Sequence, residues 1–171
     1  KIIKIKVGLN DVISEISNFQ LIAKQYSPET IFRIDANRAY SVDDAVELCC
    51  RLNNYNIQYI EEPLRKITTK SLRTLKDNIN IPIAIDETVI KKEYKQLVKN
   101  QLIEYAILKP SLFGSVKDVF KLAKYLKKNN VALIISSGLE HCIGNLSTIH
   151  IAAAFIHLMR NAKKHQNSKS F

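Results

Sequence analysis

Six polar residues, each at or directly after the end of a short apolar run, are the part of the sequence best suited to chemistry. They are three carboxylates, two lysines and a serine: Lys6, Asp35, Glu61, Asp86, Lys109 and Ser136. Successive members are 29, 26, 25, 23 and 27 residues apart. This regular spacing indicates that one repeated structural unit separates each residue from the next, so we expect the six side chains to gather in one site.

Three carboxylates in one site repel one another, and their burial is costly unless a cation holds them together. Carboxylate oxygens suit Mg²⁺ or Mn²⁺, and a set without Cys or His disfavours zinc. A partly desolvated lysine beside a cation has a lowered pKa and can act as a base near neutral pH. A metal also stabilises the enolate formed when a proton leaves the carbon next to a carboxylate. The set therefore predicts proton abstraction alpha to a carboxylate.

The elements that must position these residues follow from two alternating hydrophobic periodicities. Short runs rich in Ile, Val and Ala predict strands at Ile2–Val7, Ile31–Asp35, Gln58–Ile60, Pro82–Ile85, Tyr105–Leu108 and Ala132–Ile135. Helical spacing predicts helices at about Asp11–Gln25, Ser41–Asn53, Thr69–Asp77, Lys91–Lys99, Val116–Lys128 and Gly144–Met159.

Six strand–helix units in succession favour an α/β fold with a parallel sheet, of the TIM-type (β/α) barrel class. The carboxyl ends of barrel strands all face one mouth, where the active site lies. No glycine-rich dinucleotide-binding turn follows the first strand, which reads KVGLND, and this disfavours a Rossmann fold. We expect an incomplete barrel, with the sheet forming an open, curved layer.

Several short motifs, in a fixed order along the sequence, indicate a resemblance to a known family. The segments KIKVG, RIDANRAY, YIEEP, IAIDET, LKPSLFGS and ISSGLE occur in that order. Together they resemble the muconate-lactonizing subgroup of the enolase superfamily, and most of all the o-succinylbenzoate synthase family, dehydratases of menaquinone synthesis. The resemblance extends from Lys4 to about Phe155 and implies a metal-dependent hydro-lyase built on the enolase-type barrel.

The resemblance also implies roles for individual residues. Asp35, Glu61 and Asp86 would bind Mg²⁺, with Mn²⁺ as an alternative. Lys6 would be the general base of a syn elimination, and Lys109 would steady the enolate from the opposite face of a small anionic carboxylate substrate. Supporting or substrate-binding roles would fall to Lys4, Arg33, Asn37, Glu62, Glu87, Ser136, Ser137 and Gly138.

The chain lacks several segments of a full-length member of this superfamily. An N-terminal capping domain, the first barrel strand and a convincing eighth strand have no counterpart here. We therefore interpret residues 1–159 as a partial catalytic barrel that is poorly active alone. Residues 160–171 are polar and basic, and we expect them to be disordered. The sequence leaves the oligomeric state open.

Two other functions stay open. An amino-acid or dipeptide racemase or epimerase of the same superfamily would also use paired lysines on opposite faces. A non-catalytic basic domain would explain the formal net charge of +10 but not the ordered carboxylates.

Partners and localisation follow from composition. The lysines fall mostly on predicted outer helix faces and no nucleic-acid motif occurs, so we expect no nucleic-acid partner. No apolar run reaches the roughly 18 residues of a membrane span, so we expect no membrane partner. Three cysteines without metal-type spacing predict a reducing, cytoplasmic location.

Overall fold

The computed structural model describes the backbone of residues 1–167 and the side chains of residues 1–157. Strands and helices alternate along this part of the chain. The strands are β1 (Ile2–Lys6), β2 (Ile31–Asp35), β3 (Ile57–Glu61), β4 (Ile83–Ile85), β5 (Tyr105–Leu108) and β6 (Ala132–Ile135). The helices are α1 (Val12–Ala23), α2 (Val42–Leu52), α3 (Thr69–Lys76), α4 (Tyr94–Lys99), α5 (Val116–Lys128) and α6 (Cys142–Asn167), with 3₁₀ turns η1 (Glu87–Ile90) and η2 (Pro110–Leu112).

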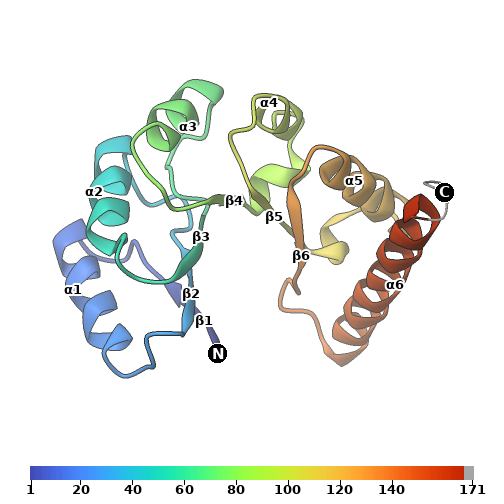
Figure 1. Ribbon diagram of the computed structural model, residues 1–171, viewed down its shortest axis with the longest axis horizontal. Helices are drawn as coiled ribbons and strands as arrows, with labels where there is room; N and C mark the ends of the chain where they lie inside the picture. Colours follow the sequence, from blue (N-terminus) through green and yellow to red (C-terminus); the bar gives the residue numbers. More distant parts are fainter. Residues whose placement is uncertain (168–171) are drawn as a thin grey trace.

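The strands form one parallel sheet in the order of the chain, from β1 to β6. The sheet curves like an arch, and helices α1 to α5 lie along its outer side (Figure 1). Within residues 1–167, β1 pairs only with β2 and β6 only with β5, so the sheet does not close on itself. The predicted incomplete barrel of six strand–helix units is thereby confirmed.

Side-chain caps fix where four of the helices begin. Asp11, Ser41, Thr68 and Ser115 each accept a hydrogen bond from a backbone N–H in the first turn of the following helix. Such caps satisfy N–H groups that have no partner within the helix, and each typically contributes about 1 kcal/mol. The caps therefore set the point at which each loop at the carboxyl end of a strand gives way to its helix.

The main hydrophobic core fills the space between the sheet and its outer helices. It includes residues exposed by no more than a few per cent, such as Phe19, Leu48 and Leu72 from the helices and Ile34 and Ile60 from the strands. Because side chains alternate along a strand, the residues on either side of Ile34 and Ile60 point to the inner face of the arch.

The inner face of the arch carries its own small apolar cluster. Tyr59, Ala84 and Ile107 are buried there, with Tyr105 and Ile134 packed against them. The register pairs Lys6 with Asp35 and Asp35 with Glu61, so these residues stand side by side at the carboxyl ends of β1, β2 and β3. The apolar cluster thus lies below a polar layer at the mouth of the sheet.

The C-terminal helix differs from its prediction. It was expected to span Gly144–Met159, with residues 160–171 disordered, whereas α6 begins at Cys142 and continues to Asn167. The stretch from Arg160 to Asn167 contains no Gly or Pro to stop the helix, and its Ala, Lys and Gln residues favour helical structure. Residues 168–171 lie outside the described part of the chain. No helix within residues 1–167 is long and apolar enough to cross a membrane.

Candidate active site

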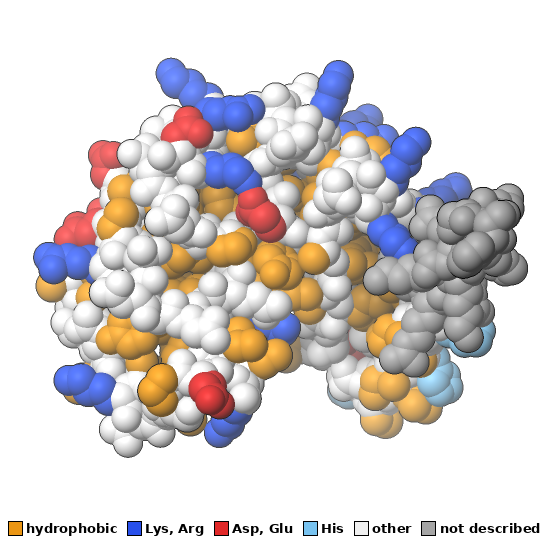
Figure 2. Space-filling view, viewed as in Figure 1, with side chains coloured by type: hydrophobic (Ala, Val, Ile, Leu, Met, Phe, Trp, Pro, Cys, Tyr) orange, Lys and Arg blue, Asp and Glu red, His pale blue; other side chains and the backbone are white. Residues whose placement is uncertain are grey.

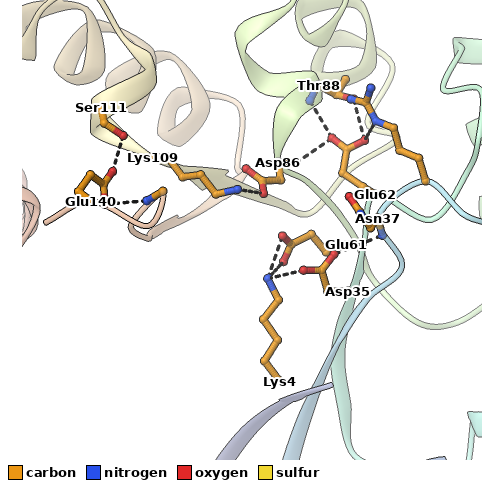
Figure 3. A network of polar contacts seen from close by, with 12 residues as sticks. Lys4, Asp35, Asn37, Glu61, Glu62, Asp86, Thr88, Lys109, Ser111 and Glu140 are labelled. Carbon is orange, nitrogen blue, oxygen red and sulfur yellow. Dashed lines mark hydrogen bonds and ion pairs between the residues drawn. The ribbon is translucent and has the colours of Figure 1, made fainter. Parts of the chain in front are cut away.

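The amino group of Lys4 lies between two of the predicted carboxylate ligands at the mouth of the sheet. Its Nζ is 3.0 Å from Oδ2 of Asp35 and 2.8 Å from Oε2 of Glu61, and it donates a 3.0 Å hydrogen bond to Oε1 of Glu61 (Figure 3). The neighbouring register of β1, β2 and β3 brings these side chains together. Lys4 therefore supplies a positive charge at the point where the two carboxylates converge.

Glu61 is the most deeply buried member of this group, with a side chain that is 1% exposed. Burial raises the pKa of Glu61 to about 7; its hydrogen bond from Lys4 opposes this shift, and the negative charge of Asp35 adds to it. Burial opposes the shift at Lys4, but hydrogen bonds to Glu61 and Asp35 prevail and raise the pKa of Lys4. One lysine thus compensates the two carboxylates only in part.

A second ion pair occupies the neighbouring strand ends. Asp86 follows β4 and Lys109 follows β5, and Nζ of Lys109 contacts Oδ2 of Asp86 (Figure 3). The side chain of Asp86 is 7% exposed and that of Lys109 is 21% exposed. Burial opposes the shift at Lys109, but the hydrogen bond to Asp86 prevails and raises the pKa of Lys109. Lys109 therefore stands at the mouth as an ammonium ion.

Lys6, the predicted base, ends β1 opposite Asp35 in the register. It lies on the same side of the strand as Lys4, two residues away, and both are solvent-exposed. Lys6 makes no ion pair or side-chain hydrogen bond with residues of the described part of the chain. Its amino group is therefore available to a ligand bound over the sheet, in contrast to that of Lys4.

The side chain of Glu62 points away from this cluster and forms hydrogen bonds with the loop after β4. Its carboxylate accepts hydrogen bonds from the backbone N–H of Asp86 at 2.9 Å and of Thr88 at 2.7 Å, and from the Thr88 hydroxyl at 3.0 Å. Nε of Arg38 also donates to it at 2.8 Å. Glu62 therefore fixes the backbone of Asp86; its supporting role toward a metal or substrate stays a prediction.

Three residues in these loops have left-handed backbone conformations. The φ angles are 43° at Asn37, 62° at Arg38 and 44° at Glu62. Non-glycine residues in this region are uncommon and cost energy, and they concentrate at functional sites. Asn37 is exposed and its N–H donates a 3.3 Å hydrogen bond to Oδ1 of Asp35, so the turn after β2 helps to orient that carboxylate.

The loop after β6 lies at the far side of the mouth. The N–H of Ser136 donates to the carbonyl of Leu108 at 2.9 Å, which ties the end of β6 to β5. The next residues, Ser137 and Gly138, form an open turn in which the Gly138 N–H donates to Glu140 at 2.8 Å. Glu140 also accepts a hydrogen bond from the hydroxyl of Ser111, in the loop after β5.

The remaining predicted residues lie around this site. Arg33 donates a 2.8 Å hydrogen bond to Gln58, and its guanidinium lies 5.4 Å from the ring centroid of Tyr59. It therefore contributes positive charge to the inner face, one layer below Asp35. Glu87 begins η1 beside Asp86 and is partly buried.

The carboxylates at the mouth fit a divalent cation only in part. Oε2 of Glu61 is buried and, although close to Lys4, has no aligned hydrogen-bond donor. Such an oxygen fits a cation because burial leaves it without water. Within the described residues, however, no three carboxylate, His or Cys side chains lie close enough to share one ion. Lys109 engages Asp86 and Lys4 engages both Asp35 and Glu61, so one ion bound by all three carboxylates would take the place of these lysine contacts.

Sequence reasoning missed several functional contacts. Arg38 and Glu140 were not identified as site residues, yet they hold Glu62 and the loop after β6. The central place of Lys4 between two carboxylates was also missed, since only a supporting role was expected. The motif NRA contained Arg38, but no local pattern indicates a partner 24 residues away. These pairings arise only when neighbouring strands are in register.

Comparison with known proteins places this site in a family context. The sequence matches the family described as Enolase C-terminal domain-like over residues 1–169. A D-Ala-D/L-Ala epimerase of Cytophaga hutchinsonii is 26% identical over 153 residues, which are 89% of this chain and 41% of that protein. An o-succinylbenzoate synthase of Mycolicibacterium smegmatis is 31% identical over 134 residues, or 77% of this chain and 40% of that protein.

A solved structure shows the same arrangement of strands and helices. The 3,6-anhydro-D-galactonate cycloisomerase from Zobellia galactanivorans is similar with a TM-score of 0.80 and 27% sequence identity, over 90% of this chain and 43% of that one. The chain spans less than half the length of the relatives that it matches. These relatives catalyse different reactions, so the comparison gives the fold and family but not the substrate.

Proposed function

Because the chain belongs to the enolase C-terminal domain-like family, we propose that it carries the catalytic residues of a metal-dependent dehydratase. The proposed reaction removes a proton alpha to a carboxylate and eliminates water, as in o-succinylbenzoate synthase, an enzyme of menaquinone synthesis. The substrate is a small anionic carboxylate. The motifs LKPSLFGS and ISSGLE favour this reaction over others of the family.

In this proposal Asp35, Glu61 and Asp86 hold Mg²⁺, or Mn²⁺ in its place. When bound, the metal supplies positive charge that stabilises the enolate form of the substrate carboxylate. The burial of Glu61 supports this assignment, since its Oε2 has an ion pair with Lys4 but no aligned hydrogen-bond donor. Lys4 compensates part of the charge of Asp35 and Glu61, and Glu62 holds the backbone of Asp86 in place.

The two lysines have different roles in this proposal: Lys6 transfers protons, and Lys109 stabilises negative charge. Lys6, in its neutral amine form, accepts the alpha proton and becomes an ammonium ion; its side chain is exposed at the mouth and has no ion pair within the described residues. The same ammonium then donates a proton to the departing hydroxide on that face, which completes a syn elimination. Lys109 remains an ammonium ion across the mouth and steadies the negative charge that develops on the substrate. The single observation that carries the proposal is this pair of lysines flanking three carboxylates at successive strand ends.

Epimerisation of an amino acid or dipeptide is the second candidate. The epimerase from Cytophaga hutchinsonii is nearly as similar to this chain as the synthase, and it covers more of it. Lysines on opposite sides of the mouth also suit proton removal from one face and return to the other. In this reaction Lys109 would have to exchange a proton, whereas in the dehydration it keeps its charge.

The experiment follows both reactions in the natural protein that contains these residues. Formation of o-succinylbenzoate from its succinyl-hydroxycyclohexadiene-carboxylate precursor is measured by ultraviolet absorbance with Mg²⁺ or with EDTA. Solvent deuterium incorporation into Ala-Glu dipeptides is measured in parallel. Product that requires Mg²⁺ and disappears in Lys6→Ala supports the dehydratase. Deuterium incorporation without dehydration assigns the site to epimerisation, and an intact protein inactive in both assays contradicts both.

A further inference from the structure

A cavity rich in positive charge lies on the outer side of the loops that follow β2, β3 and β4. It has a volume of about 220 Å³, and its lining includes Arg38, Arg65, Lys66, Thr88, Lys91 and Glu93. Glu61 and the other mouth carboxylates do not line it. The cavity is therefore a separate feature from the candidate active site, although Arg38 and Thr88 connect the two through Glu62.

Three of the four cations of this cavity have no carboxylate partner within the described residues, whereas Arg38 is paired with Glu62. Among the described residues, the amino groups of Lys66 and Lys91 have no ion pair, and Arg65 donates only to the carbonyl of Ala39, at 2.9 Å. Glu93 is the one carboxylate in the lining. Like charges gathered around a concave surface create a positive potential that attracts an anion.

Arg38 makes the cavity more than a loose group of surface side chains. Its Nε donates to Glu62 at 2.8 Å and its Nη2 to the Thr88 hydroxyl at 3.0 Å, so the guanidinium is fixed in orientation. Its side chain is 28% exposed. Glu62 is buried and already accepts two backbone N–H groups, which anchors Arg38 to the loops after β3 and β4. Glu62 and Thr88 use two donors of this guanidinium, and its remaining N–H groups, together with the lysine ammonium groups of the lining, can donate to an oxyanion.

We infer that this cavity, formed by Arg38, Arg65, Lys66 and Lys91, is a binding site for a phosphate group. A phosphate dianion matches the excess of positive charge and offers several acceptor oxygens to donors that surround it. The inference goes beyond the proposed function and does not rest on it, because it uses none of the proposed metal ligands or catalytic lysines.

Calorimetric titration with inorganic phosphate tests this inference on the metal-free chain at constant ionic strength. The expected result is saturable binding that weakens at least tenfold in the Lys66→Gln/Lys91→Gln variant. The matched control is Lys124→Gln/Lys128→Gln, which removes the same charge from α5 and should bind as the parent does. Arg38 is kept because its loss would disturb Glu62. Thermal unfolding of each variant establishes that it is folded.

Two further measurements sharpen the outcome. Glu93→Gln removes the only carboxylate of the lining and should tighten phosphate binding severalfold. Glycerol 3-phosphate compared with inorganic phosphate tells whether the site prefers a phosphorylated small molecule or the free ion. The inference is overturned if neither compound binds saturably. It is also overturned if binding survives in Lys66→Gln/Lys91→Gln, or if the α5 control weakens it equally, since the phosphate is then held elsewhere or by net charge alone.

Discussion

Glu61 and Glu62 are consecutive in the chain, yet their carboxylates face opposite sides of β3. Glu61 meets Lys4 at the mouth of the sheet, whereas Glu62 meets Arg38 and the backbone of Asp86 and Thr88 (Figure 3). Both side chains are 1% exposed. The two acids differ in their partners, because Glu62 accepts four hydrogen bonds, whereas among the described residues the Glu61 carboxylate has Lys4 alone, which donates a hydrogen bond to Oε1 and forms an ion pair with Oε2.

This difference predicts that replacing each glutamate by glutamine affects a different property, stability for Glu62 and Mg²⁺ binding for Glu61. Glu62→Gln should lower the free energy of unfolding by about 2–3 kcal/mol, since it leaves Arg38 without its charged partner. Glu61→Gln should leave stability nearly unchanged at neutral pH but weaken Mg²⁺ binding at least tenfold. Urea unfolding and calorimetric Mg²⁺ titration of both variants check this. A Glu61→Gln variant that binds Mg²⁺ as the parent does would remove Glu61 from the proposed site.

The stability of the metal-free protein should fall as pH rises through the neutral range. Burial raises the pKa of Glu61 from 4.5 to about 7, so the folded chain holds this proton more tightly than the unfolded chain does. The free energy of unfolding therefore declines between about pH 4.5 and pH 7, by up to about 3 kcal/mol. The raised pKa of Lys4 acts only above pH 10.5 and leaves this window unchanged.

The measurement is urea unfolding at pH 5 and pH 8 in EDTA. Glu61→Gln should lose most of the difference between the two pH values, whereas Glu29→Gln, in an exposed turn, should retain it. Equal pH dependence in both variants would show that another group causes the decline.

Glycine is required at position 8 both by the backbone conformation and by the close approach of Ala39. Its φ angle is 92°, and a Cβ atom there would lie 2.2 Å from Cβ of Ala39. Gly8→Ala should therefore destabilise the protein by at least about 2 kcal/mol, because both the strained conformation and the clash must be relieved. Gly114→Ala is the control, since its Cβ meets no atom within 4 Å, and its effect should stay within about 0.5 kcal/mol. Thermal unfolding compares the two variants.

The three cysteines should differ sharply in reactivity. Cys49 is 1% exposed, and burial raises the pKa of its thiol to about 12, whereas Cys50 and Cys142 are exposed. Thiolates are the reactive form. Titration with a thiol reagent at pH 8 should show two fast groups in the folded protein and a third only in denaturant. Loss of both fast groups in Cys50→Ser/Cys142→Ser would identify them, and fast reaction of Cys49 in that variant would contradict the prediction.

The sequence allowed the fold to be predicted because each strand–helix unit carries its own periodicity. Ile31–Asp35, Tyr105–Leu108 and Val116–Lys128 were predicted with the bounds that the structure has. Parallel order then brings Lys6, Asp35 and Glu61 to one end of the sheet. Their roles in metal binding and proton transfer stay predictions, because they depend on a ligand that lies over the sheet.

The contacts that sequence reasoning missed depend on distances between side chains from separate loops. Arg38 reaches Glu62 across one strand–helix unit and Thr88 across two, and Ser111 reaches Glu140 across one. Hydrophobic periodicity reports which face of an element is buried, but not which loop residues meet beyond the strand ends. The end of α6 was missed for a related reason, since polar composition alone does not separate a helix from a disordered segment.

The position of Lys4 has a consequence for whether folding or metal binding comes first. The ammonium group of Lys4 is an internal counter-ion for Asp35 and Glu61, so these strand ends can fold without a metal. Small metallodomains differ, because their chains are unfolded without their ion. The protein should accordingly stay folded when chelators strip it. In the proposed function, a metal bound by Asp35 and Glu61 would take the place of the Lys4 ammonium group, so metal uptake would exchange one cation for another. Competition with Lys4 would then set the lowest metal concentration at which the proposed site is filled.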